Sequence, residues 1–520
     1  MGWQGTVVKN RIPVNISRRI NPVLPVICWL SLLFALPGFA GTIYVDQSLR
    51  SNCAGRYSSV DRRCDSGSET AVKDLSAGLS ASQPGDTVIL RAGFYGQIAP
   101  SVSGVAGRPV TIKSYEGEKP TVETAGAVGI KMDNRAFITI EGVTFSQVGG
   151  FGHLYDCNNI LIRNCSFSSS LFSGTTGALK LVRSKTCKIV TNSFRQGASD
   201  LLILQDGSDR NVVAGNVFDT ARHSLLSIRC SNFNVVRSNT FRNPKQKALE
   251  IYDCEGISDA PVRLDATKRN LFEENLFVLT AASDRIYKFN AIQHGGQLTI
   301  VRKNVFTNCE GGGVNYQSYP DESIYVYKNR LYNNTFYHNR CFGIIGNSGD
   351  GSHYFDNVAK NNLLYKNSDC SGHGNQVSIE NSWAVILSDN VLATTDPGFV
   401  NESGNDLHLT AASPLVDQGV FVTRAAESGS GTTLRVSDAG YFTDGFGIPG
   451  EAGDWVQFQG QTTPARILAI DYALNTLTLD RPLSWSAGQG LHLAYSGRAP
   501  DVGAFESGSG SADANRLPAS

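Results

Sequence analysis

A short motif recurs along the middle of this chain: an alternating apolar run, then Asn, one or two further residues, and Phe or Leu. Between about residues 140 and 392 the Asn falls at Asn164, Asn192, Asn216, Asn239, Asn275, Asn304, Asn334, Asn362 and Asn390. Subtracting successive positions gives intervals of 28, 24, 23, 36, 29, 30, 28 and 28 residues. A second apolar alternation, such as Leu179-Lys180-Leu181, lies between several of these marks. Each repeat therefore contains at least two short strands with a period of two.

A repeat of this size cannot bury its own apolar face, so neighbouring repeats must stack to bury it. Parallel stacking at about 4.8 Å per coil would place each inward side chain above its equivalent. Asn suits the corners of such coils because it tolerates left-handed backbone and its amide both donates and accepts hydrogen bonds. The motif therefore predicts a solenoid of parallel strands with columns of Asn along its length.

This pattern resembles the right-handed parallel β-helix of the pectate-lyase-like superfamily, over about Thr42 to Val420 and again near Ala499 to Glu506. Its N-terminal part carries Tyr44-Val45-Asp46, an amphipathic stretch from Glu69 to Ala81, and a strand-like run from Pro84 to Tyr95. In proteins of this kind a helix plugs the first coil. The resemblance implies an all-β fold, a right-handed parallel β-helix with an N-terminal helical cap.

Five segments are expected in the 520 residues. An apolar stretch from Val26 to Ala40 follows Arg18 and Arg19 and is too short to span about 30 Å of hydrocarbon, so residues 1–40 are predicted to be a secretory signal. Residues 41–420 form the β-helix with its cap, and alternating runs within 421–497 predict a small inserted β module. Residues 498–507 close the β-helix, and 508–520 form a disordered tail. We expect a periplasmic or extracellular protein with no membrane span after signal removal.

Composition excludes one class of partner. The chain has 46 basic and 46 acidic residues and no basic cluster, whereas nucleic-acid binding requires clustered Lys and Arg. Of 11 Cys, Cys53 and Cys64 lie close together in a polar loop and could form a disulfide in an oxidising compartment. Most others adjoin apolar runs and are predicted to be buried thiols, because no spacing typical of a zinc site occurs.

Aligning the coils on their Asn places outward residues in columns. Lys180, Ile203, Ser227 and Glu250 form one column, and Asp200, His223 and Lys247 precede three successive strands. Arg229, Tyr252 and Asp253 lie just beyond the strands. Side chains two coils apart are about 10 Å apart, which suits successive sugars of a bound glycan. The alternative is a solvated face that binds no ligand, which would show the same polar residues.

The 36-residue interval between two Asn marks contains extra residues from Glu255 to Lys268, which would form a loop beside this polar strip.

A closer resemblance lies in the run from Asn239 to Cys254 and in Ile292-Gln293-His294-Gly295. Both look like polysaccharide lyase family six, the alginate lyases and chondroitinase B. The resemblance implies a calcium-binding role for Glu250 and matches His294 to a His-Gly step. Where that family has another calcium-binding Glu, a catalytic Lys and a catalytic Arg, this chain has Ala248, Glu255 and Gln293. Uronate elimination needs a neutralised carboxylate, a base and an acid, so the family's usual mechanism is not expected here.

The predicted site follows from these columns. Its catalytic residues are Lys247, His223, Arg229 and His294, with Lys247 or His223 as the base and Arg229 or Arg222 neutralising a carboxylate. Its substrate-binding residues are Arg222, Tyr252, Lys180 and Gln293. Its metal ligands are Glu250 and Asp253, and two alternatives stay open for the cofactor: calcium or none.

Three functions stay open. The chain is a lyase or epimerase acting on uronate residues of an acidic polysaccharide, a non-catalytic glycan-binding or structural envelope or surface protein, or a glycoside hydrolase, for which carboxylate pairs on neighbouring coils would be needed. An acidic polysaccharide is the expected partner, and a monomer is the expected state. A binding protein would use outward rings for stacking, and the candidates are Tyr252, Tyr287, Tyr316, Tyr319, Tyr325, Tyr327 and Tyr332.

Overall fold

The computed structural model describes residues 40–252, 267–278, 290–316, 325–346, 354–379 and 385–508. All of these belong to the compact unit Ala40–Ser520. Residues 1–39 of the predicted signal lie outside the described residues, as do residues 509–520 of the predicted tail. Within the described part, no helix has the length and apolar character needed to cross a membrane.

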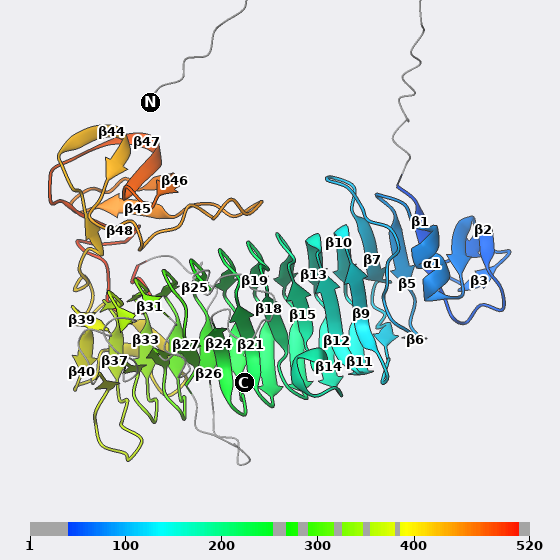
Figure 1. Cartoon of the computed structure of the whole chain (residues 1–520), viewed down its shortest axis with the longest axis horizontal. Coiled ribbons are helices and arrows are strands. Elements are labelled where there is room, and N and C mark those ends of the chain that lie inside the picture. The colour runs from blue at the N-terminus through cyan, green and yellow to red at the C-terminus, as the bar shows by residue number, and fades with distance from the viewer. Residues whose placement is uncertain are drawn as a thin grey trace, which may run out of the picture. The chain divides into compact units, whose positions relative to one another are not determined.

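Three long sheets run along the unit, and the coils in the middle of the solenoid contribute one strand to each of them in turn (Figure 1). Sheet A has 16 strands, in spatial order β3 (Arg63–Cys64), β2 (Cys53–Ser58), β4 (Glu69–Val72), β1 (Thr42–Val45), β5 (Thr87–Leu90), β7 (Val110–Ser114), β10 (Ala136–Glu141), β13 (Asn158–Arg163), β16 (Lys188–Val190), β19 (Val212–Ala214), β22 (Val235–Arg237), β25 (Leu271–Glu273), β28 (Ile300–Arg302), β32 (Arg330–Tyr332), β36 (Val358–Lys360) and β39 (Ile386–Ser388). Sheet B has 12 strands: β40 (Val391–Ala393), β37 (Leu363–Tyr365), β33 (Thr335–Tyr337), β29 (Val305–Thr307), β26 (Leu276–Val278), β23 (Thr240–Arg242), β20 (Val217–Ala221), β17 (Ser193–Gly197), β14 (Ser166–Ser170), β11 (Thr144–Val148), β8 (Thr121–Val122) and β6 (Phe94–Tyr95). Sheet C has 10 strands: β38 (Val377–Ser378), β34 (Ile344–Ile345), β30 (Val314–Tyr316), β27 (Ile292–His294), β24 (Lys247–Tyr252), β21 (Ser224–Arg229), β18 (Leu202–Gln205), β15 (Leu179–Val182), β12 (Gly150–Tyr155) and β9 (Val128–Asp133).

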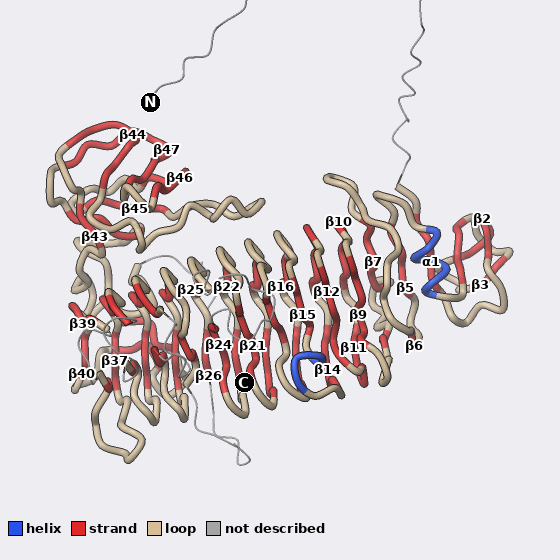
Figure 2. Tube along the Cα trace, in the orientation of Figure 1, coloured by secondary structure: helices blue, strands red, loops and turns tan. Residues whose placement is uncertain are grey.

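The remaining elements lie outside these three sheets. They are the helix α1 (Leu75–Ala81), the 3-10 turn η1 (Gly174–Gly177), and the strand pairs β31 (Val326–Tyr327) with β35 (Tyr354–Phe355) and β41 (Phe399–Asn401) with β42 (Asp406–Leu409). A separate antiparallel sheet near the C-terminal end holds β43 (Thr423–Arg424), β44 (Gly429–Arg435), β45 (Trp455–Phe458), β46 (Ala465–Asp471), β47 (Thr476–Trp485) and β48 (Gly490–Leu493). We call this antiparallel sheet together with its connecting loops, residues 423–493, the β module (Figure 2).

The solenoid core is built from columns of identical side chains. On sheet B the rings of successive coils stack nearly parallel, with centroids 4.5 to 5.2 Å apart. The stacked rings are Phe145, Phe167, Phe194, Phe218, Phe241, Phe277, Phe306 and Phe336. All are buried, and the strand registers pair each with the next, as between Phe194 and Phe218. The predicted in-register stacking of parallel coils is therefore confirmed.

The predicted Asn column is a continuous ladder at the corner between sheets A and B. From Asn192 to Asn390 each amide oxygen accepts the backbone N–H of the preceding Asn at 2.8 to 3.0 Å. The prediction that Asn164 belongs to this ladder is wrong. Cys165 occupies the ladder position in that coil and donates its backbone N–H to the side-chain oxygen of Asn192. Asn164 is the neighbouring residue with left-handed backbone, φ 54°. A second ladder, Asn211 to Asn234 to Asn270, was not predicted.

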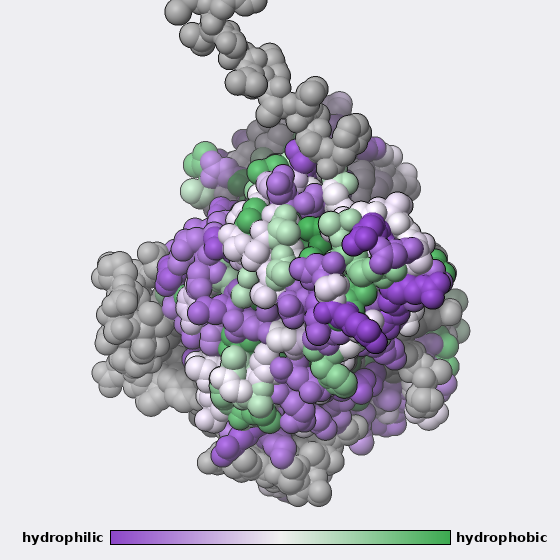
Figure 3. Space-filling model, turned by 90° about the vertical axis from the view of Figure 1, so that its right-hand side faces the viewer, coloured by the Kyte–Doolittle hydropathy of each residue, from purple (hydrophilic) through white to green (hydrophobic). Residues whose placement is uncertain are grey.

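The N-terminal cap differs from the prediction in one respect. Glu69–Val72 forms strand β4, and only Leu75–Ala81 is helical. Leu75 and Leu79 of α1 are buried in the first coils of the core, so the helix does plug the solenoid. The surface of the molecule at the end that carries the N-terminal cap is largely hydrophilic (Figure 3).

The cysteines that the structure describes follow the sequence prediction only in part, because Cys230, Cys341 and Cys370 are disulfide-bonded and are not the free buried thiols expected there. The predicted Cys53–Cys64 disulfide is present in the cap, and Cys341–Cys370 is a second disulfide. The free cysteines Cys157, Cys165, Cys187 and Cys309 are all buried. The predicted buried thiols are therefore confirmed at these positions.

The β module packs on the outer face of sheet A. Outward apolar side chains of sheet A, such as Val235 and Tyr332, share one hydrophobic cluster with Phe442 of the module. Partly buried ion pairs join the same two parts: Arg302 bonds Asp454 at 2.7 Å, and Arg330 bonds Asp438 at 2.8 Å. The module is thereby fixed against successive coils.

Candidate functional site

Sheet C carries the polar column predicted from the sequence. Its register places Lys180, Ile203, Ser227 and Glu250 opposite one another on β15, β18, β21 and β24. The column continues to Gln293 on β27. Because inward leucines and isoleucines flank each of these residues, the predicted alignment of this column is confirmed in space. Gln293 is almost fully buried, at 5% exposure, and contributes little open surface.

The second predicted column is shifted by one residue. Lys247 pairs with Ser224 and not with His223. Counting back two positions from the paired leucines Leu226 and Leu249 gives this register, and that signal was available in the sequence. Ser224 is thus a site residue that sequence reasoning missed.

His223 and Asp200 form a pair at the start of this column. Nδ1 of His223 lies 2.8 Å from Oδ1 of Asp200, and the same oxygen accepts the backbone N–H of Ser224 at 2.9 Å. Asp200 is buried, whereas the His223 side chain is 28% exposed. A buried carboxylate that accepts Nδ1–H fixes the tautomer and leaves Nε2 able to accept a proton.

Lys247 and Glu250 form a buried ion pair beside this pair. The Lys247 ammonium contacts Oε1 of Glu250, and the Ser224 hydroxyl donates to Oε2 at 3.1 Å. Both side chains are almost completely inaccessible. The predicted role of Lys247 as a base that contacts substrate is therefore not supported, because its ammonium neutralises Glu250 out of reach of solvent.

Cationic side chains lie along the next part of the face. Burial lowers the pKa of Lys180, and the nearby positive charge of Arg229 lowers it further, while Asp206 opposes both effects. Arg229 is in register with Gln205 and is partly buried. Arg222 lies between β20 and β21 and is exposed. These side chains can neutralise a carboxylate bound over sheet C.

The structure places His294 inside the solenoid. It pairs in register with Ile251, points inward beside the Tyr316 ring at 5.1 Å, and is fully buried. Burial lowers its pKa to about 3. The predicted catalytic role of His294 is corrected, since a neutral core imidazole cannot contact substrate. Strand alternation is the reason: Gln293 faces out and His294 faces in. Tyr316 and Tyr332 are likewise buried and are not stacking platforms.

The predicted metal site is only partly visible. Glu250 already faces an ammonium and a hydroxyl, whereas calcium requires six to eight oxygen ligands. Among the described residues no cluster of three or more His, Cys, Asp or Glu could hold a metal ion. Asp253 and residues 255–266 of the predicted loop lie outside the described part, and the Tyr252 side chain is not described either. The calcium site stays a prediction.

Comparison with known proteins bears on the fold. A family model described as a right-handed β-helix region matches residues 113–277. No curated protein matches the sequence significantly. With its wound coils of three parallel sheets, the chain is a right-handed parallel β-helix protein.

Several solved structures are similar to this chain. Pectate lyase Pel9A has 13% identity, covering 90% of this chain and 96% of its own, with a TM-score of 0.49. A family 6 polysaccharide lyase from Pseudopedobacter saltans has 16% identity, covering 61% and 90%, with a TM-score of 0.39. The catalytic domain of a family 87 α-1,3-glucanase, solved with nigerose, has 11% identity, covering 59% and 64%, with a TM-score of 0.40. The activities in these names belong to those proteins.

Proposed function

We propose that this protein acts on uronate residues of an acidic polysaccharide bound along sheet C, as a lyase or an epimerase. The observation that carries the proposal is the buried Asp200 carboxylate that orients the partly exposed His223 imidazole on the outward face. A positioned imidazole of this kind is a suitable general base.

The chemistry needs a base and a neutralised carboxylate. Nε2 of His223 removes the proton from the sugar carbon that bears the carboxylate, and Lys180 and Arg229 offset the negative charge that develops on that group. In a lyase the electron pair then forms a carbon–carbon double bond and expels the neighbouring glycosidic oxygen, which takes up a proton from water. In an epimerase a proton from water is delivered to the opposite face of the same carbon.

We also propose that the protein works outside the cytoplasm. The Cys53–Cys64 and Cys341–Cys370 disulfides support this location, because disulfides persist in oxidising compartments. Polysaccharide substrates of the proposed kind are found there as well.

The test uses a panel of uronate polymers and follows the absorbance of newly formed unsaturated ends, with proton exchange into the polymer as the readout for epimerisation. Each assay is run with calcium and with a chelator. We expect His223→Ala to lower the rate by about 100-fold or more. His373→Ala is the matched control, because His373 also faces an aspartate, Asp369 at 3.1 Å, but is 77% exposed elsewhere on the surface. Equal rates for His223→Ala and the unaltered protein would overturn the proposed base.

A non-catalytic glycan-binding role is the second candidate. The burial of Lys247 against Glu250 favours it, because both residues then stabilise the face without reaching a substrate. Binding of a uronate polymer without unsaturated product or proton exchange would establish this alternative. A hydrolase is less favoured, since Asp200 and Glu250 are both engaged by basic side chains and neither is left as a free acid.

A further inference from the structure

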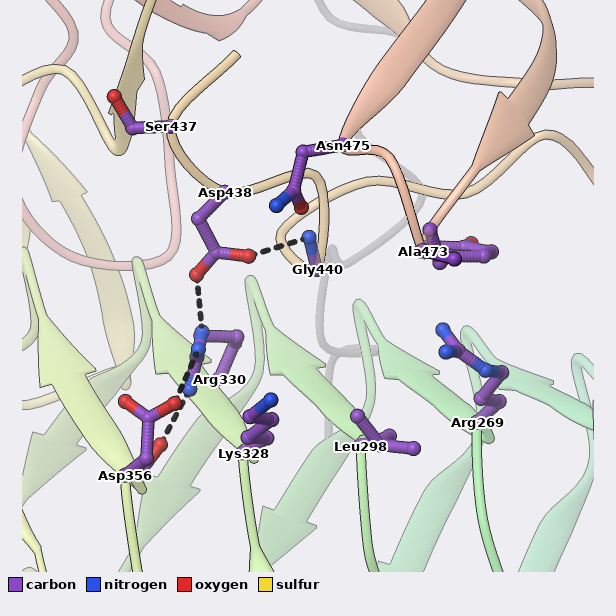
Figure 4. Close-up of a pocket in the computed structure, with 11 residues that line it drawn as sticks. Arg269, Leu298, Lys328, Arg330, Asp356, Ser437, Asp438, Gly440, Ala473 and Asn475 are labelled. Carbon is purple, nitrogen blue, oxygen red and sulfur yellow. Dashed lines mark hydrogen bonds and ion pairs between the residues drawn. The ribbon is translucent and has the colours of Figure 1, made fainter.

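A cavity of about 490 Å³ lies between the β module and the coil corners that precede sheet A (Figure 4). Arg269, Leu298, Lys328 and Asp356 line one side, and Tyr472 and Asn475 of the module line the other. This cavity is separate from the Asp200–His223 pair on sheet C, with which it shares no lining residue.

The solenoid side of the cavity is a column of corner residues, one from each coil. All four have left-handed backbone, with φ between 53° and 55°. Successive corners lie in neighbouring coils: the N–H of Leu298 bonds Tyr327 O, and the N–H of Lys328 bonds Phe355 O. Arg269 and Lys328 are two coils apart, and their backbones are therefore about 10 Å apart.

The cavity is lined by three cations, Arg269, Lys328 and Arg330, and by two acids, Asp356 and Asp438. Both acids bond Arg330. Arg330 donates to Asp438 at 2.8 Å and to Asp356 at 3.4 Å, and Gly440 N–H also bonds Asp438. The acids therefore do not neutralise the two corner cations.

Arg269 and Lys328 are the two other cations of the cavity, and neither Asp356 nor Asp438 forms an ion pair with them. The Arg269 guanidinium lies over the Tyr472 ring, 3.9 Å from its centroid, and burial lowers its pKa. Among the residues that the structure describes, neither cation has an ion pair or a side-chain hydrogen bond. A partly desolvated guanidinium of this kind is well suited to bind a carboxylate through paired N–H groups.

The module completes the cavity with a neutral donor. The side-chain oxygen of Asn475 accepts the backbone N–H of Ala439 at 3.0 Å, which leaves its amide N–H groups for the cavity. Figure 4 shows Asn475 facing the corner column from above, with Arg269 and Lys328 directed toward the module. Because ion pairs fix the module on sheet A, this arrangement exists before a ligand binds.

We propose that this cavity is a second binding site, for two carboxylates of an oligouronate segment held by Arg269 and Lys328. The anionic character of the ligand rests on the cavity alone, and its carbohydrate character rests on the proposed function. A second site would anchor the polymer while sheet C acts on another part of it, and the gain in affinity would come from linking two binding events.

The test measures hydrogen exchange and calorimetric binding of the full chain with a uronate hexamer. We expect protection of peptides covering residues 437–440 and 472–475. The double variant Arg269→Gln/Lys328→Gln should lose this protection and bind at the cavity at least about tenfold more weakly. The matched control is Lys119→Gln/Arg195→Gln, which removes two exposed cations elsewhere on the solenoid. Thermal unfolding of both variants checks that they are folded.

Each outcome has one meaning. Unchanged protection in the double variant, or equal protection by a neutral glucose hexamer, would overturn the second site. Protection of peptides around residues 200–229 alone would also overturn it and would leave the proposed function standing. Protection at the cavity without protection or turnover at sheet C would support the second site and reject the proposed function.

Discussion

Glu506 is the clearest case in which burial changes the chemistry of a single residue. Burial raises its pKa to about 8, and the nearby negative charge of Asp501 adds to the increase. Its two oxygens accept the N–H groups of Ser496 and Asp501 at 3.0 and 3.1 Å. The folded protein therefore retains a proton on Glu506 that the unfolded chain releases above its ordinary pKa.

This raised pKa predicts a specific pH dependence. From the ordinary glutamate pKa to about pH 8 the folded state binds more protons than the unfolded state, so Glu506 reduces stability as pH rises through that interval. We expect Glu506→Gln to reduce the loss of melting temperature between about pH 5 and pH 8. Glu427→Gln, at an exposed carboxylate, is the control. An identical pH dependence in the Glu506 variant and the unaltered protein would rule out this account.

Residue type alone does not separate His223 from His294. Both lie on or beside sheet C strands, yet one is partly exposed against Asp200 and the other is fully buried. Strand alternation, with Gln293 outward, indicates that His294 points inward, and the register of β27 with β24 confirms it. The sequence thus predicted the outward face of sheet C and its polar column. The roles of individual residues depended on how neighbouring strands of this sheet pair.

At the scale of the element, the Asn ladder stabilises the sheet A to sheet B corner by serving buried backbone groups. Asn239 accepts the N–H of Asn216 at 2.9 Å and donates to Val213 O at 2.8 Å and to Asn275 at 3.0 Å. It is almost fully buried, so water cannot replace these partners. Each coil therefore depends on its neighbours on both sides.

Removing one step of this ladder should be costly. Asn239→Ala leaves a buried N–H and a buried carbonyl without partners, and each costs about 1 to 3 kcal/mol. We expect a loss of about 2 to 6 kcal/mol in the free energy of unfolding, measured by denaturant titration. Asn158→Ala, at an exposed position that starts β13, should change stability by less than about 0.5 kcal/mol. Similar losses for the two variants would contradict the ladder's role.

At the scale of the whole molecule, Arg302 connects the solenoid to the β module. It is buried and bonds Glu273 and Asp454 through its guanidinium, and it donates to the Tyr332 hydroxyl at 3.0 Å. These acids hold its pKa well above the ordinary arginine value. The Arg302 side chain, on β28 of sheet A, therefore links this sheet to the loop that precedes β45 in the β module.

Loss of this arginine should loosen the module. Arg302→Met leaves Asp454 and Glu273 partly buried without their partner, and breaking such a buried pair costs about 3 to 5 kcal/mol. We expect faster proteolysis within residues 421–497 and a lower melting temperature. Arg163→Met, which removes an exposed ion pair with Glu141 on the same sheet, should cost less than about 1 kcal/mol. A module equally resistant to protease in both variants would argue against this anchoring role.

The sequence by itself determined the wound fold, because a recurring Asn and period-two apolar runs can bury their surface only by stacking in register. It also determined the outward column on sheet C, since alternation fixes which side chains leave the core. Tertiary structure alone decided the pairing of His223 with Asp200, the burial of Lys247 with Glu250, and the cavity beneath the module. These depend on side chains brought together from different coils and on the packing of residues 423–493 against sheet A, which no local pattern encodes.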